Sequence, residues 1–288
     1  MKKTKIIYYI FPFHIDLLEK TIYQLKRAAN YSNTKDYLSI EVVLDMSEKN
    51  IDWSNCKIPK QYFIDKFKYI ETYCDFFESV NFELNDQLLG SGGQHRRTYD
   101  NNNGEYNIIA LDLYVLENII PSIEKQSSTY MITPQIPKWW DSSWDIISNE
   151  QYIKSPIKFD DINPFKLDKC DVENIGLIKN YNHKFAGGWF NFYSAELTKL
   201  MKIPKNIGIF HHQDFYLQEM FKILNQKEHD IPQYIIQNCL VFEDRKYYHE
   251  NEFLHKKYLP YQINRPHMEG PENIYKEVIK ELNKLKNE

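Results

Sequence analysis

The first 45 residues constrain the fold more than any other part of the chain, because they read as strand, helix and strand. Lys5–Phe11 is rich in β-branched and aromatic residues, which is typical of a buried strand, and Pro12 ends it. Residues 16–29 place leucine and isoleucine side chains on one helical face, and residues 38–44 predict a second strand. Such a unit belongs to a parallel sheet with a right-handed crossover. The predicted fold class is therefore α/β.

The stretch from Gly90 to Val115, GSGGQHRRTYDNNNGEYNIIALDLYV, carries most of the recognisable chemistry. A glycine-rich turn precedes the adjacent Arg96 and Arg97, and a short apolar run ends on Asp112. A carboxylate just past a buried strand lies at the carboxyl edge of a sheet, where open α/β folds place their ligands. Guanidinium groups are planar, permanently charged donors that suit phosphate. The stretch predicts a site for a phosphorylated ligand, with or without a metal.

The remaining elements continue the α/β pattern. Residues 62–81 have a helical or mixed pattern, and residues 86–100 predict a glycine loop followed by a helix. Strands are expected at 106–111, 130–133, within 184–193 after a Gly-Gly break, and within 232–242, and helices at 117–126, 195–201, 215–224 and 271–286. Residues 1–245 are expected to form one domain. Residues 246–288 are expected to form an aromatic and basic C-terminal extension that ends in a helix.

Composition argues against several classes of function. The net charge of −4 disfavours a protein that holds nucleic acid through a broad basic surface. The four cysteines lie far apart without metal-ligand spacing, so neither a zinc site nor a disulfide framework is indicated. No stretch approaches the ~20 apolar residues that span a bilayer, and the N-terminus lacks the pattern of a secretion signal. We expect no transmembrane segment and a cytoplasmic location.

Aromatic residues make up 15% of the chain, including 22 tyrosines. This share is compatible with stacking on sugars or bases, but it also follows from AT-rich coding. Three tryptophans, Trp139, Trp140 and Trp144, stand in a loop-rich insert. They could stack on an acceptor sugar or simply pack the loop onto the domain, and the sequence leaves both interpretations open.

The order of motifs resembles the GT-A glycosyltransferases, and among them the large family-two group. The similar segments are IIYYIFPFHIDLLEKTIYQL, VVLDMSE, the stretch beginning at Gly90, FAGGWFNFYS and HHQDFYLQEMF. The resemblance covers roughly residues 4–225. The resemblance implies a GT-A type nucleotide-binding fold, with a central, mainly parallel mixed sheet flanked by helices. It also implies transfer of a sugar from a nucleotide-sugar donor, such as a UDP-sugar, to an acceptor hydroxyl. We expect a single displacement with inversion, although retaining relatives share the fold.

The resemblance also implies roles for particular residues. Asp214 would be the general base, and Gly187, Gly188 and Trp189 would border the acceptor and the donor sugar. The donor nucleotide would be bound by residues from four segments, namely Pro12, Phe13, Asp45, Arg96, Arg97 and Asp112. A divalent cation, Mn²⁺ or Mg²⁺, would be held by Asp112 and His267, since these ions favour carboxylate oxygen and water and need few protein ligands.

Two departures from the family pattern, together with ordinary structural roles, keep alternatives open. Tyr114 replaces the second Asp of the Asp-x-Asp motif, which bears on metal dependence, and Gln213 precedes Asp214 where the family has Glu. Asp45 could be a turn aspartate, Asp214 a helix N-cap and the Gly-Gly pair a β-bulge. The rival function is a non-catalytic nucleotide- or carbohydrate-binding protein on the same fold. The acceptor is expected to be a glycan or another hydroxyl compound, with a modified DNA base less favoured.

Overall fold

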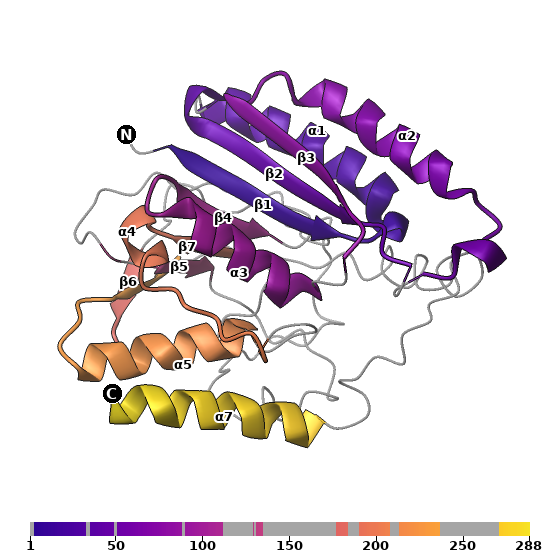
Figure 1. The fold of residues 1–288 in the computed structure, drawn as a ribbon. Coiled ribbons are helices and arrows are strands. Elements are labelled where there is room, and N and C mark those ends of the chain that lie inside the picture. Colours follow the sequence, from indigo (N-terminus) through magenta and orange to yellow (C-terminus); the bar gives the residue numbers. More distant parts are fainter. Residues whose placement is uncertain are drawn as a thin grey trace, which may run out of the picture.

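A computed structural model describes residues 3–32, 35–48, 51–87, 90–111, 129, 131–134, 177–183, 190–207, 213–236 and 271–288. These residues form an α/β protein in which a mixed, mostly parallel sheet of eight strands is flanked by helices (Figure 1). The strand order is β3-β2-β1-β4-β7-β5-β8-β6. No helix in the described ranges has the length and apolar character needed to cross a membrane.

The elements have the following bounds. The strands are β1 Thr4–Ile10, β2 Leu38–Asp45, β3 Ser79–Asn85, β4 Asn107–Leu111, β5 Met131–Pro134, β6 Leu177–Asn180, β7 Phe190–Tyr193 and β8 Gln233–Ile236. The helices are α1 Ile15–Ser32, α2 Lys60–Glu71, α3 Gly90–Asn102, α4 Ala195–Thr198, α5 Gln213–Gln226 and α7 Pro271–Asn287. Short 3₁₀ turns are η1 Pro12–His14, η2 Lys35–Tyr37, η3 Trp53–Asn55 and η4 Thr72–Cys74.

The predicted strand–helix–strand unit is confirmed as β1, α1 and β2, with the two strands parallel. β3 pairs with the outer side of β2, whereas β4 pairs with the other side of β1, and both pairings are parallel. The strand order therefore reverses at β1. β7 then runs antiparallel between β4 and β5, and β6 is an antiparallel strand at the far edge of the sheet.

The sheet separates two apolar cores. Ile6, Tyr8 and Ile10 of β1 face the first core, which α1 and α2 cover. Ile7, between them in the chain, faces the second core, which lies on the side of α4, α5 and α7 (Figure 1). The helix expected at the C-terminus is α7, and its Val278 is buried in this second core beside α5. Alternation along β1 thus assigns each residue to one face of the sheet.

Several local predictions are corrected by the structure. The segment 62–81 divides into α2 and the beginning of β3, and β6 was not predicted. The expected glycine loop is helical from Gly90 onward, and α4 ends at Thr198 rather than at residue 201. β3 escapes sequence reasoning because it is an edge strand whose side chains are mostly exposed or half-buried. The helix expected at 117–126 and the tryptophan-rich insert lie outside the described residues.

Candidate functional site

The carboxyl edge of the sheet near β1 is the candidate site. In open α/β sheets, ligands bind outside the carboxyl ends of the strands, at the point where the strand order reverses. Here that point lies between β1 and β4, because the chain proceeds from β1 to β2 and β3 on one side and returns to β4 on the other. The segments that follow β1 and β2 both emerge at this edge.

Asp45 is the last residue of β2, and its carboxylate is fully buried. Oδ2 accepts a hydrogen bond from the hydroxyl of Tyr9 on β1, and Oδ1 accepts one from the backbone N–H of Ser47 at 2.8 Å. The backbone N–H of Met46 donates to the carbonyl oxygen of Asn85, the last residue of β3, at 2.7 Å. The three parallel strands are thus tied together where they end, and Asp45 fixes the turn after β2.

The segment after β1 forms the short turn η1, which begins at the buried Pro12. His14 is buried at its end, and its Nδ1 accepts a hydrogen bond from the backbone N–H of Phe11 at 3.2 Å. An imidazole whose Nδ1 accepts must carry its proton on Nε2 when neutral. The side chain of Phe13 lies outside the described part of the structure. Sequence reasoning identified Pro12 but missed His14 and Tyr9, whose contacts depend on the turn and on the register of two strands.

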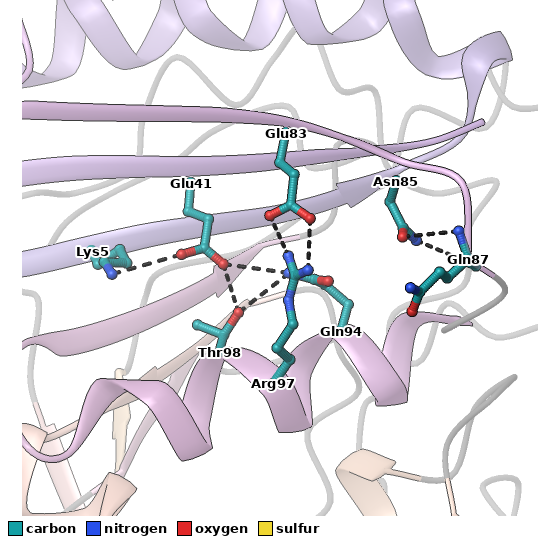
Figure 2. A network of polar contacts seen from close by, with 8 residues as sticks. All are labelled: Lys5, Glu41, Glu83, Asn85, Gln87, Gln94, Arg97 and Thr98. Carbon is teal, nitrogen blue, oxygen red and sulfur yellow. Dashed lines mark hydrogen bonds and ion pairs between the residues drawn. The ribbon is translucent and has the colours of Figure 1, made fainter. Parts of the chain in front are cut away.

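The two arginines of α3 diverge and have different protein partners. Nη1 and Nη2 of Arg97 donate to the two carboxylate oxygens of Glu83 on β3, each at 2.6 Å (Figure 2). Nη1 of Arg96 donates to the carbonyl oxygen of Pro204 at 2.9 Å. The fork-to-fork pair is the strongest geometry available to a guanidinium and a carboxylate. In this structure both arginines anchor α3, and a phosphate could bind the Arg97 fork only in competition with Glu83.

A polar layer continues between α3 and the sheet beside this pair. The carboxylate of Glu41 on β2 accepts hydrogen bonds from Thr98 Oγ1 at 2.7 Å and from Gln94 Nε2 at 3.4 Å (Figure 2). Lys5 Nζ of β1 lies 3.7 Å from the second oxygen of Glu41 and 4.6 Å from the centre of the Tyr106 ring. Three neighbouring strands therefore each contribute a charged side chain to the surface that α3 covers.

Asp214 lies in the first turn of α5, which begins at Gln213, and its side chain is half-buried. Burial raises the pKa of Tyr99 on α3 and of Tyr193 on β7, and the nearby charge of Asp214 raises both further. The two tyrosine rings meet edge to face, with centroids 5.8 Å apart. Asp214 therefore opens α5 next to a buried aromatic pair from α3 and β7. As a first-turn carboxylate it also interacts favourably with the helix dipole.

The aromatic pair extends to a histidine on α3. The ring of His95 lies 5.8 Å from that of Tyr99, and burial lowers the pKa of His95 to about 4. The imidazole is therefore neutral at physiological pH. Sequence reasoning did not single out this histidine, because its position on the inner side of α3 is set by packing.

Five predicted site residues lie outside the described residues, namely Asp112, Gly187, Gly188, Trp189 and His267. Tyr114, which replaces the second Asp of the motif, also lies outside them. Asp112 directly follows Leu111, the last residue of β4, in the chain. Within the described ranges there is no group of three or more His, Cys, Asp or Glu side chains that could hold a metal.

A scan against models of protein families found no match, and a search of curated proteins found none either.

Proposed function

We propose that the protein is a GT-A type glycosyltransferase, which moves a sugar from a nucleotide-sugar donor to an acceptor hydroxyl. The observation that carries this proposal is the pairing of two resemblance motifs at one edge of the sheet. The Pro12 turn follows β1 and Asp45 ends β2, and the two strands are adjacent and parallel beside the point where the strand order reverses. This is the expected position for a nucleotide in an open α/β sheet.

The proposed reaction is a single displacement at the anomeric carbon. The acceptor oxygen forms a bond to that carbon as the bond to the donor diphosphate breaks, and the diphosphate leaves with the electron pair. The carboxylate of Asp214 takes the proton of the attacking hydroxyl, a contribution that is typically worth ~10²–10⁴-fold in rate. The position of Asp214 at the start of α5, beside the buried Tyr99 and Tyr193, supports this role.

Asp112 and His267 would hold a divalent cation in this proposal. A carboxylate oxygen and an imidazole nitrogen are a suitable donor set for Mn²⁺, and the carboxylate also suits Mg²⁺. When bound, such an ion would supply positive charge to the departing diphosphate, which is usually the largest electrostatic contribution to this kind of transfer. Because Glu83 and Pro204 engage the guanidinium groups of Arg97 and Arg96, the proposal assigns these arginines to the positioning of α3.

A non-catalytic nucleotide- or carbohydrate-binding protein is the second candidate, and one observation favours it. Tyr114 stands where the family has a metal-binding Asp. A protein that kept the fold but lost turnover would still bind its ligand at the same edge of the sheet. The distinction is therefore one of turnover, and binding alone does not settle it.

The test combines ligand binding with donor hydrolysis. Thermal unfolding is measured with a panel of nucleoside diphosphates and nucleotide sugars, with and without Mn²⁺. A ligand at 100 times its dissociation constant adds about 2.7 kcal/mol to stability. We expect one nucleotide to give a selective shift that Asp112→Asn removes, whereas Asp214→Asn keeps the shift and loses donor hydrolysis.

The matched control is Asp65→Asn, which changes an exposed carboxylate on α2, on the other face of the sheet. This variant should behave as the wild type in both measurements. A panel without any selective shift would overturn the proposal. A selective shift without hydrolysis or transfer under any metal condition would favour the non-catalytic alternative.

A further inference from the structure

The turn that joins α3 to β4 contains the one Asn-Gly pair of this chain, Asn103 and Gly104 (Figure 1). Both residues have a positive φ, 43° at Asn103 and 75° at Gly104. Glycine adopts this left-handed conformation without cost, and asparagine does so more readily than most other residues. A Cβ at position 104 would also meet the side chain of Lys199. The fold therefore sets an asparagine directly before a glycine for structural reasons.

An asparagine followed by glycine is chemically reactive. The backbone nitrogen of the next residue can attack Cγ of the asparagine side chain, and the two residues then share a five-membered succinimide ring. A side chain on the next residue hinders this approach, whereas glycine has no Cβ and leaves the backbone free to adopt the necessary angles. The same residue types that suit the turn are thus the types that suit ring closure.

The surroundings of Asn103 leave its side chain available for this reaction. Asn103 is exposed, and within the described part of the chain its side-chain amide has no hydrogen-bond partner. The backbone bond that closes the turn runs from the N–H of Glu105 to the carbonyl oxygen of Asn102 at 2.8 Å, and it bypasses the N–H of Gly104. The amide of Asn103 can therefore rotate toward the backbone nitrogen of Gly104.

The preceding asparagine is held in the opposite state. Asn102 is 3% exposed, and its Nδ2 donates to the carbonyl oxygen of Tyr106 and to Oγ1 of Thr198, each at 2.8 Å. Its Oδ1 accepts a hydrogen bond from the backbone N–H of Tyr106 at 3.1 Å. These three bonds fix the amide of Asn102 and tie the end of α3 to the start of β4. Ring closure at Asn102 would have to break all of them.

Asn101 completes the run of three asparagines. It is exposed, but it lies within α3 and is followed by Asn102 rather than by glycine. Exposure alone therefore does not distinguish Asn103 from Asn101. What distinguishes Asn103 is the combination of an exposed, unbonded amide with a glycine as the next residue, in a turn outside the helix.

We propose that Asn103 is a site of spontaneous covalent modification by deamidation. The nitrogen of Gly104 loses its proton to water or hydroxide and forms a bond to Cγ of Asn103, and the bond from Cγ to Nδ2 breaks as ammonia leaves. Water then opens the succinimide. Attack of water at Cγ gives aspartate, whereas attack at the backbone carbonyl carbon gives isoaspartate. The overall reaction consumes one water and releases one ammonia, without a change of oxidation state.

The modification changes both the charge and the backbone of the turn. Each product carries one more negative charge than the original chain, close to the exposed Glu105. Isoaspartate in addition inserts one carbon atom into the main chain directly after Asn102, which ties α3 to β4. The proposal therefore predicts two acidic forms of the protein, of which one has a lengthened turn.

The test follows the folded full chain during storage at mildly alkaline pH. Isoelectric focusing should show an acidic band that grows with time. Peptide mapping by mass spectrometry should place the conversion at Asn103, with aspartate and isoaspartate as the products. We expect Asn103 to be lost at least about tenfold faster than Asn102 in the same peptide, a difference of about 1.4 kcal/mol in activation free energy.

Two conservative variants identify the residue responsible. Asn103→Gln keeps an amide but would need a six-membered ring, which closes far more slowly, so its acidic band should be absent. Asn101→Gln is the matched control, since it changes an exposed asparagine of the same run and should form the band as the wild type does. Mapping of the wild type keeps the proposal testable even if Asn103→Gln folds poorly.

Three results would overturn the proposal. An equal acidic band in Asn103→Gln would place the modification elsewhere. Equal loss at Asn102 and Asn103 in the folded protein would show that the surroundings of the two amides do not matter. An Asn103 that stays intact in the folded protein, but is converted in the urea-unfolded chain, would show that the turn protects the pair. None of these measurements depends on the proposed function.

Discussion

The buried histidine beside β6 makes the stability of this protein depend on pH in a predictable way. His183 is 1% exposed, with Nε2 2.8 Å from the carbonyl oxygen of Ile231 and Nδ1 3.3 Å from Sδ of Met131. The carbonyl can only accept, so Nε2 carries a proton, and burial keeps the imidazole neutral. Burial lowers the pKa of His183 to about 4, although the hydrogen bond to Ile231 opposes this and the charge of Lys222 reinforces it.

The sign of the effect follows from proton linkage. In the unfolded chain the histidine has its ordinary pKa of 6.5, so below pH 6.5 the unfolded state takes up a proton that the folded state does not. The folded state is therefore most stable above pH 6.5, and this stability is lost progressively as the pH falls from 6.5 to 4. The two pKa values of His183 differ by about 2.5, which corresponds to a loss of roughly 3 kcal/mol in the free energy of unfolding once the pH has fallen below both.

The assay is urea unfolding of the wild type and His183→Gln at pH 7.5 and pH 5. Glutamine can still donate to the carbonyl of Ile231 but does not titrate. Between these two pH values the wild type should lose about 2 kcal/mol more of its free energy of unfolding than the variant does. His229→Gln, which changes an exposed histidine after α5, should follow the wild type. Equal losses in the wild type and His183→Gln would refute the reasoning.

Three further changes test the anchoring of the fold by urea unfolding at pH 7.5. A double-mutant cycle of Arg97→Ala and Glu83→Ala should give a coupling energy of about 0.5–1 kcal/mol, and this energy should fall at high salt because the pair is only partly buried. A coupling energy of zero would mean that the Arg97–Glu83 pair does not hold α3 in place. Gly104→Ala should lose about 1–2 kcal/mol, because φ is +75° and the new Cβ would meet the Lys199 side chain; an unchanged midpoint would contradict this. Tyr9→Phe should lose about 1–3 kcal/mol, since it removes a donor from a fully buried carboxylate, whereas a stability equal to that of the wild type would show that the bond contributes nothing.

The parts of the fold that could be predicted are those with strong hydrophobic periodicity. β1 and β2 are nearly continuous apolar strands, and α1 carries a wide apolar face, so a short window of sequence identifies each of them. β3 could not be recognised in this way. Its residues are mostly exposed or half-buried, and what makes them a strand is their pairing with β2, from Ser39 and Ser79 onward.

The start of α3 shows tertiary contacts overriding local propensity. A segment with three glycines in four residues is a poor helix former, and the sequence predicts a loop there. The segment is helical because the helix is held from outside: Thr98 and Gln94 bind Glu41, and Arg97 binds Glu83. These partners stand on β2 and β3, so no local window of sequence contains them.

At the candidate site, the sequence predicted which residues matter better than it predicted their contacts. Asp45 could be singled out because it ends a recognisable strand, but its bond to Tyr9 depends on the register between β1 and β2. Arg97 was assigned to a phosphate because arginine suits phosphate. Its partner Glu83 precedes it by only 14 residues but stands on the strand that the sequence did not reveal. An arginine's ligand can be inferred only when every nearby carboxylate has been placed.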